Sequence, residues 1–421
     1  MTGKTRLLVV ITIVASLFLF TSFAGAAEKV LKVGVMGPFT GPSAKAGQEF
    51  KDSVKMGLDK IGGKIGDYKI EPVWVDSQSD PAKATNALAE AIERKGIVAG
   101  CINWHSSVAA ACMDLTAQYK VPWLFGMGAA AIVVTKWRSD PEKYSWWSAK
   151  GWPVPGKLEA TQSVAFMNEA MKKGLWKPKG KKAAIFGEDT DWGRNAGENL
   201  KAALKAGGWE ITSEDYFALT QTDFYPLLSK WKKAGVAFVG GTTTAAASMT
   251  GLVKQFKEVG VKALLFANGL SWVGNWYKMT GPASNGVIDV QAQFGSKAAK
   301  AFAKAKEKRF GYAPSAPASG LSYDGFNFFV KVLKRTLEKY GKITSEDIHK
   351  VIVDEVNTGK LTFTAADGAI MMKSYQYTPE TVPDPVVGPE DYFFPVIQYE
   401  NGKSSIIFPD SMKEKAFTPP M

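Results

Sequence analysis

Residues 31–47 read LKVGVMGPFTGPSAKAG, and this stretch starts a pattern that the rest of the chain repeats. Leu31–Met36 is typical of a strand, whereas Gln48–Ile61 has apolar residues at helical spacing. The loop between them, Gly37–Gly47, is rich in glycine, which lets a ligand approach the backbone closely. Its glycines fit neither a dinucleotide fingerprint nor a Walker loop, so the loop does not indicate a nucleotide.

Strand and helix alternate on both sides of the Pro- and Gly-rich segment Trp146–Gly156 (WWSAKGWPVPG). Before it, strands are expected at 31–36, 70–75, 96–102 and 122–125, with helices at 48–61, 82–93 and 108–119. After it, strands are expected at 183–186, near 211, 236–240 and 263–266, with helices at 157–173, 193–206, 224–233 and 246–259. Helices at 297–310 and 323–340 follow, and strands at 395–399 and 404–408 end the chain. Two such series predict an α/β protein with two doubly wound parallel sheets.

Composition excludes several functional classes. A length of 421 residues, 46% of them hydrophobic, indicates two or three globular domains. The net charge is +12, but the lysines are spread along predicted helix faces, so we expect no nucleic-acid partner. With 2 cysteines and 2 histidines, a disulfide framework or a zinc site has too few ligands, and no metal or cofactor is expected.

The first 26 residues have the pattern of a signal peptide. Lys4 and Arg6 precede an uncharged apolar stretch, Leu7–Phe23, which is followed by small residues at 24–27. An uncleaved membrane anchor is the alternative. We expect cleavage near Ala26 and a soluble mature protein in the periplasm. In that oxidising compartment Cys101 and Cys112 could pair, but their positions favour two buried free thiols.

Ligands of doubly wound sheets bind beyond the carboxyl ends of the strands, against helix N-termini. The loop Cys101–Ser107 (CINWHSS) ends at such a terminus, where Ser106 and Ser107 could hold a carboxylate or simply cap the helix. His105 could also bond a carboxylate, or be a packing histidine. The later loops that hold Trp192, Thr243, Asn268 and Trp272 fall at the equivalent position, and each of these loops is otherwise an ordinary solvated loop.

Nothing in the chain points to catalysis. There is no G-x-S-x-G elbow, and His349 falls in a polar helix far from the candidate loops. No pattern supports a pair of catalytic carboxylates. We therefore expect a binding protein with no catalytic residue.

An ordered set of motifs resembles the leucine/isoleucine/valine-binding protein family, the periplasmic solute receptors of branched-chain amino acid-type ABC importers. The set comprises residues 33–42 with Ala44 and Gly47, Gly62–Gly66, Asp76 with Asp80-Pro81, Val98–Gly100, Val121-Pro122, Asp189 with Trp192-Gly193, and Tyr323-Asp324. The resemblance runs from about residue 30 to about 365. It implies type I periplasmic binding protein architecture, with two Rossmann-like lobes joined by three crossings that close on a ligand.

The resemblance also implies roles for particular residues. The family holds an amino-acid carboxylate with a serine at the position of Ser106. It holds the ammonium with a hydroxyl residue in the next loop and with a glutamate from the other lobe. Here the next loop contains Gly128 and Ala129 and no hydroxyl, and the acidic position falls near Asn268. The aromatic of the second lobe is kept as Trp192. We therefore expect an aromatic or apolar carboxylate rather than leucine.

The full set of expected ligand-binding residues is Trp104, His105, Ser106, Ser107, Gly128, Ala129, Trp192, Thr243, Asn268 and Trp272. The expected N-terminal lobe comprises 27–148 and 290–362, and the C-terminal lobe comprises 149–289 and 363–421. We expect a monomer that delivers a small molecule to an ABC transporter permease. A sensor that reports to a membrane receptor is the alternative, and a secreted enzyme on the same scaffold is a weaker third reading.

Overall fold

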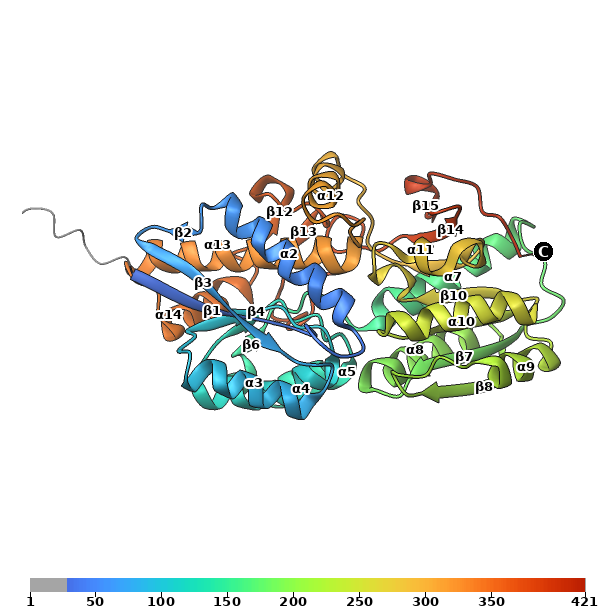
Figure 1. The fold of residues 1–421 in the computed structure, drawn as a ribbon, viewed down its shortest axis with the longest axis horizontal. Coiled ribbons are helices and arrows are strands. Elements are labelled where there is room, and N and C mark those ends of the chain that lie inside the picture. The colour runs from blue at the N-terminus through green and yellow to red at the C-terminus, as the bar shows by residue number, and fades with distance from the viewer. Residues whose placement is uncertain (1–28, 421) are drawn as a thin grey trace, which may run out of the picture.

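A computed structural model describes residues 29–420, which form two lobes side by side (Figure 1). The first lobe is built on a six-stranded sheet with strand order β2-β3-β1-β4-β5-β6, in which only β2 runs antiparallel to its neighbour. Its strands are β1 (Lys29–Gly37), β2 (Lys64–Ile65), β3 (Tyr68–Asp76), β4 (Ala99–Cys101), β5 (Trp123–Leu124) and β6 (Trp147–Ser148).

Helices cover both faces of this sheet. In Figure 1, α2 and α13 lie on one side of it and α3 and α4 on the other. The bounds are α2 (Ala44–Lys60), α3 (Pro81–Glu93), α4 (Ser106–Tyr119), α5 (Ala131–Ser139), α6 (Pro141–Tyr144), α12 (Lys297–Phe310), α13 (Ser322–Tyr340) and α14 (Ser345–Val351). The predicted start of α3 is explained by its sequence, because the Asp80 side chain accepts from Lys83 N and Pro81 occupies the first turn.

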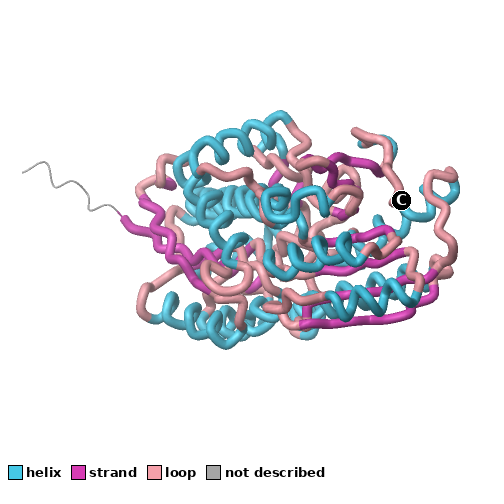
Figure 2. Tube along the Cα trace, turned by 45° about the vertical axis from the view of Figure 1, so that its right-hand side comes forward, coloured by secondary structure: helices cyan, strands magenta, loops and turns pink. Residues whose placement is uncertain are grey.

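The second lobe has a seven-stranded sheet with strand order β15-β14-β11-β10-β9-β7-β8. Its strands are β7 (Lys182–Glu188), β8 (Glu210–Phe217), β9 (Phe238–Thr242), β10 (Leu264–Asn268), β11 (Ile288–Val290), β14 (Val396–Glu400) and β15 (Lys403–Phe408). Its helices are α7 (Glu159–Lys172), α8 (Asp191–Ala206), α9 (Tyr225–Ala234), α10 (Ala246–Val259) and α11 (Trp276–Thr280). The tube view in Figure 2 shows these helices alternating with the strands.

The second sheet is mixed, whereas we had expected it to be entirely parallel. The hairpin β14–β15 adds to its edge in antiparallel orientation. The two-residue turn Asn401-Gly402, in which both residues have positive φ (48° and 81°), accounts for the antiparallel pairing of β15 with β14. Such a turn joins adjacent antiparallel strands directly and leaves no room for a crossover helix.

The chain passes between the sheets three times: after β6, after β11, and before β14. This architecture confirms the predicted fold class of two α/β lobes. The short hairpin of β12 (Phe363–Thr364) and β13 (Ser374–Tyr375) packs against α13, because buried Asp324 accepts hydrogen bonds from Ile370 N, Met371 N and Tyr375 Oη. Residues 363–375 therefore lie with the first sheet, whereas we had expected them in the C-terminal lobe. The remaining lobe boundaries stay a proposal.

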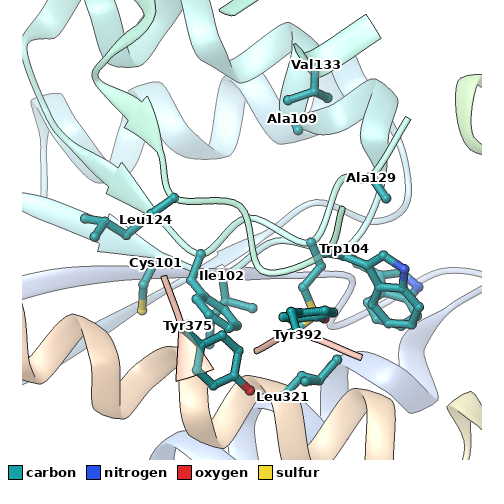
Figure 3. Close-up of a cluster of buried hydrophobic side chains, with 14 of the residues drawn as sticks. Cys101, Ile102, Trp104, Ala109, Leu124, Ala129, Val133, Leu321, Tyr375 and Tyr392 are labelled. Atoms are coloured by element: carbon teal, nitrogen blue, oxygen red, sulfur yellow. The ribbon is translucent and has the colours of Figure 1, made fainter. Parts of the chain in front are cut away.

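Two further expectations concern the two cysteines and the N-terminal segment. Cys101 and Cys112 are both buried and unpaired, and Figure 3 shows Cys101 among the apolar side chains around β4. The predicted signal peptide lies outside the described residues. Within residues 29–420, no helix combines the length and the apolar character that crossing a membrane requires.

Candidate functional site

The N-terminus of α4 lies at the edge of the first sheet that faces the second lobe. Its first intrahelical bond runs from Ala109 N to His105 O, and no side chain caps it. Ser106 Oγ accepts from Ala130 N at 3.0 Å, so the Ser106 hydroxyl proton remains free for another acceptor. Ser106 is therefore not the helix cap that the alternative interpretation required. The uncapped N–H groups and this hydroxyl together favour an anionic group.

Asn103 fixes this terminus against the neighbouring loop. Its side chain donates to His105 O at 2.9 Å and accepts from Gly128 N at 3.1 Å. A Cβ at Gly128 would lie 3.0 Å from Ser106 Cα, so only glycine allows the loop to approach so closely. Gly128 thus positions the loop. Figure 3 shows Trp104 and Ala129 near each other at the ends of the two loops.

A small cavity of about 20 Å³ lies between this terminus and the second lobe. It is lined by Trp104, His105, Ser106, Met127, Ala129, Trp152, Trp192, Thr244 and Trp272. Four of these residues are tryptophans, each at most 7% exposed, and we call them the tryptophan cage. The indole N–H groups of Trp104 and Trp272 are buried and have no hydrogen-bond partner among the described residues. Both remain available to a ligand.

Polar contacts join the lobes beside the cavity. Ser43 Oγ donates to Thr244 O at 3.1 Å, and Thr244 Oγ1 donates to Glu188 Oε2 at 2.7 Å. His105 Nε2 lies 3.3 Å from Ser43 Oγ and 3.2 Å from Thr244 Oγ1. Since both hydroxyl protons are already used, Nε2 carries the proton and donates to these oxygens. The structure is therefore closed, with His105 as part of the contact between the lobes.

This network changes the role that we expected for His105. Its Nδ1 is left as a buried acceptor without a partner among residues 29–420, and an acceptor does not bind a carboxylate. Burial also lowers the pKa of His105 to about 4, so the ring is neutral near pH 7. His105 as a carboxylate donor does not fit this geometry.

Three buried carboxylates stand behind the cavity in the second lobe. Glu159 Oε1 accepts from Trp152 Nε1 at 2.6 Å, and Glu188 is bonded to Thr244. Asp289 accepts from Asn268 Nδ2 at 3.0 Å. Burial raises the pKa of all three, to about 8 for Glu159 and about 7 for Asp289. None of them is paired with a lysine or arginine in the described part of the chain.

Asn268 is linked to the cage without lining it. Trp192 Nε1 donates to Thr242 Oγ1 at 3.0 Å, and Thr242 Oγ1 donates to Asn268 Oδ1 at 3.2 Å. Asn268 therefore connects Trp192 to the buried Asp289. We had expected Asn268 itself to contact ligand, but it lies behind the tryptophan.

The structure brings most of the predicted site residues together. Those that line the cavity are Trp104, His105, Ser106, Ala129, Trp192 and Trp272; those that do not are Ser107, Gly128, Thr243 and Asn268. Sequence reasoning missed Met127, Trp152 and Thr244, which also line it. Thr244 adjoins the predicted Thr243. Trp152 lies in the first crossing, the segment 146–156, for which the sequence had indicated no ligand contact.

Comparisons with known proteins agree with this architecture. A family model described as periplasmic binding protein matches residues 30–380. Leu/Ile/Val-binding protein homolog 6 of Brucella melitensis is 26% identical over 341 residues, which cover 76% of this chain and 80% of that protein.

Two solved structures from Rhodopseudomonas palustris share the fold. An ABC transporter solute-binding protein of strain BisB5, in complex with 3,4-dihydroxybenzoic acid, has a TM-score of 0.70 at 23% identity and covers 88% of this chain and 93% of its own. A second solute-binding protein, in complex with benzoate, has a TM-score of 0.71 at 18% identity and covers 90% of this chain and 95% of its own.

Proposed function

Because the chain belongs to the periplasmic binding protein family, of the leucine/isoleucine/valine-binding type, we propose that it is the solute receptor of an ABC importer and binds a small carboxylate between its lobes. The observation that carries the carboxylate is the uncapped N-terminus of α4, where the free Ser106 hydroxyl meets the closed cavity. The unpartnered indole N–H groups of Trp104 and Trp272 add buried donors. Closure would bury the ligand and create the surface that the permease recognises.

The same cavity is a poor site for leucine. A primary ammonium in a closed cleft needs several acceptors, or much of its hydration energy is lost. No carboxylate lines the cavity, and His105 Nδ1 is a single acceptor. The two Rhodopseudomonas palustris proteins support a ligand of another kind, since their benzoates bear a carboxylate and no ammonium. We propose a carboxylate whose other end is held by tryptophan faces.

The remaining parts of the proposal follow from the family and the sequence. The chain is exported to the periplasm and cleaved near Ala26. It acts as a monomer without catalysis and without nucleic acid, and its protein partner is the permease of the importer.

Replacement of Ser106 by alanine tests the carboxylate end of the site. We expect Ser106→Ala to weaken binding by about 1–3 kcal/mol, because a charge-assisted bond from the hydroxyl is lost. Isothermal titration with the tightest-binding member of a carboxylate panel measures this. Ser107→Ala is the matched control, since Ser107 does not line the cavity and its loss should leave affinity unchanged. Equal affinities of the two variants would remove Ser106 from the site.

A further inference from the structure

The rings of the tryptophan cage stand nearly perpendicular to one another. Trp104 and Trp152 cross at 88° with centroids 6.3 Å apart, Trp104 and Trp272 at 85° and 5.2 Å, and Trp152 and Trp272 at 87° and 6.0 Å. Trp192 crosses Trp152 at 74° and Trp272 at 50°. No two of these rings are parallel, so a flat aromatic ligand cannot be stacked between two of them and can make only single stacking or edge-to-face contacts. Perpendicular faces instead surround a compact, rounded group.

The size of the cage suits a cation. The ring centroids in these contacts lie 5.2–6.5 Å apart, and a tryptophan ring attracts a cation that lies within about 6 Å of its centroid. Tryptophan is the most favourable ring for this contact, and aromatic cages are a recurring site for quaternary ammonium groups. Neither lysine nor arginine lines the cavity, so no side chain of the protein occupies this position.

The buried carboxyl groups next to the cage also favour a cationic ligand. The three carboxyl groups, Glu159, Glu188 and Asp289, are all buried. The first two are hydrogen-bonded directly to residues that line the cavity, and Asp289 is linked to one through a series of hydrogen bonds. Burial favours the protonated form of these carboxyl groups, and a positive ligand beside them would favour the ionised form. The bond from Trp152 Nε1 to Glu159 also draws negative charge toward that indole, which strengthens its attraction for a cation.

We propose that the cage binds a methylated ammonium group, so that the ligand is a betaine, with a quaternary ammonium at the cage and a carboxylate at the N-terminus of α4. The carboxylate end rests on the proposed function. A methylated ammonium has no N–H groups, so the absence of the family's hydroxyl and glutamate leaves nothing unsatisfied. Its charge is met by the tryptophan faces and by the carboxylates behind them.

A pair of isosteres tests the proposal on the unmodified mature protein. Glycine betaine and 3,3-dimethylbutanoate have the same shape and the same carboxylate, but a trimethylammonium in the first is a neutral tert-butyl group in the second. Isothermal titration should show glycine betaine binding at least about tenfold more tightly, the factor that a desolvated cation–π site supplies. Benzoate, leucine and choline complete the panel.

The panel separates this proposal from the proposed function. Equal or tighter binding of 3,3-dimethylbutanoate or benzoate would overturn the cation site and leave the carboxylate receptor intact. Binding of choline as tight as that of glycine betaine would keep the cage and contradict the carboxylate end. Tight leucine binding would contradict both and restore the family's ordinary ligand. Failure of every member to bind would count against both.

Proton release gives a second readout that needs no variant. Of the charged groups that face Glu159, Lys150 lowers its pKa and Asp289 raises it, while Tyr392 stays protonated, and burial brings the pKa to about 8. A bound cation lowers that pKa, so protons leave on binding and affinity rises as the pH increases toward about 8. Titrations of glycine betaine in buffers of different ionisation enthalpy should show release at pH 7. Proton uptake, or none, would contradict a cation in the cage.

Discussion

Asp384→Asn is expected to lower the free energy of unfolding by about 3–5 kcal/mol, the usual cost of leaving one charge of a buried pair without its partner. Lys150 Nζ and Asp384 Oδ1 lie 2.7 Å apart, and their side chains are 0% and 1% exposed. Lys150 N also donates to Pro383 O at 2.8 Å. The pair therefore fastens the first crossing between the lobes to the third, at the hinge on which closure depends.

Denaturant unfolding of three variants checks this. Replacing both partners, as in Lys150→Met with Asp384→Leu, should recover most of the loss, because no charge then remains buried. Glu390→Gln is the matched control, since Lys373 and Glu390 form an exposed pair and such pairs contribute about 0–1 kcal/mol. A loss for Asp384→Asn no greater than that for Glu390→Gln would show that the buried pair does not hold the hinge.

Trp152→Ala is expected to weaken ligand binding about a hundredfold or more, which is the scale of a central aromatic hot spot. Trp152 is 2% exposed, and its ring contacts those of Trp104, Trp192 and Trp272. Its removal opens one wall of the cage and leaves Glu159 without its indole donor. Titration of glycine betaine into the purified variant measures the loss.

Trp209→Ala separates lost binding from lost stability. Trp209 is equally buried, at 3% exposed, but it stacks on Trp176 away from the cavity. Both variants should unfold more easily, because each leaves a large core cavity. Only Trp152→Ala should lose affinity at a temperature where both are folded. Matching affinities for the two variants would place the ligand elsewhere.

The regular parts of the fold could be predicted from sequence because their signals are local. Helix α10 has the bounds that its apolar spacing indicates, and α3 starts where its Asp-Pro cap indicates. Strand β11 could not be found in this way, because three residues are too few to show a period. The position of residues 363–375 depends on buried Asp324, a contact between segments far apart in the chain.

The residues of the candidate site also fall into two groups, those that have a local sequence signal and those that do not. Ser106 and Trp104 could be predicted because the end of a strand and the start of a helix mark their position. Trp152 could not, because its place in the cage depends on how the first crossing folds between the lobes. The role of His105 was also beyond the sequence, since its tautomer is set by Ser43 and by Thr244 from the other lobe. Contacts across a closing cleft carry no local signal.

We propose that the two lobes close around a ligand at the tryptophan cage. A distance between the lobes tests it most directly, using spin labels on Lys83→Cys in α3 and Lys254→Cys in α10, both at exposed positions. The native cysteines are buried and would not be labelled. With the tightest-binding carboxylate at saturation, we expect a shift from a broad, longer distribution to one short distance. An unchanged distribution with ligand demonstrably bound would contradict it.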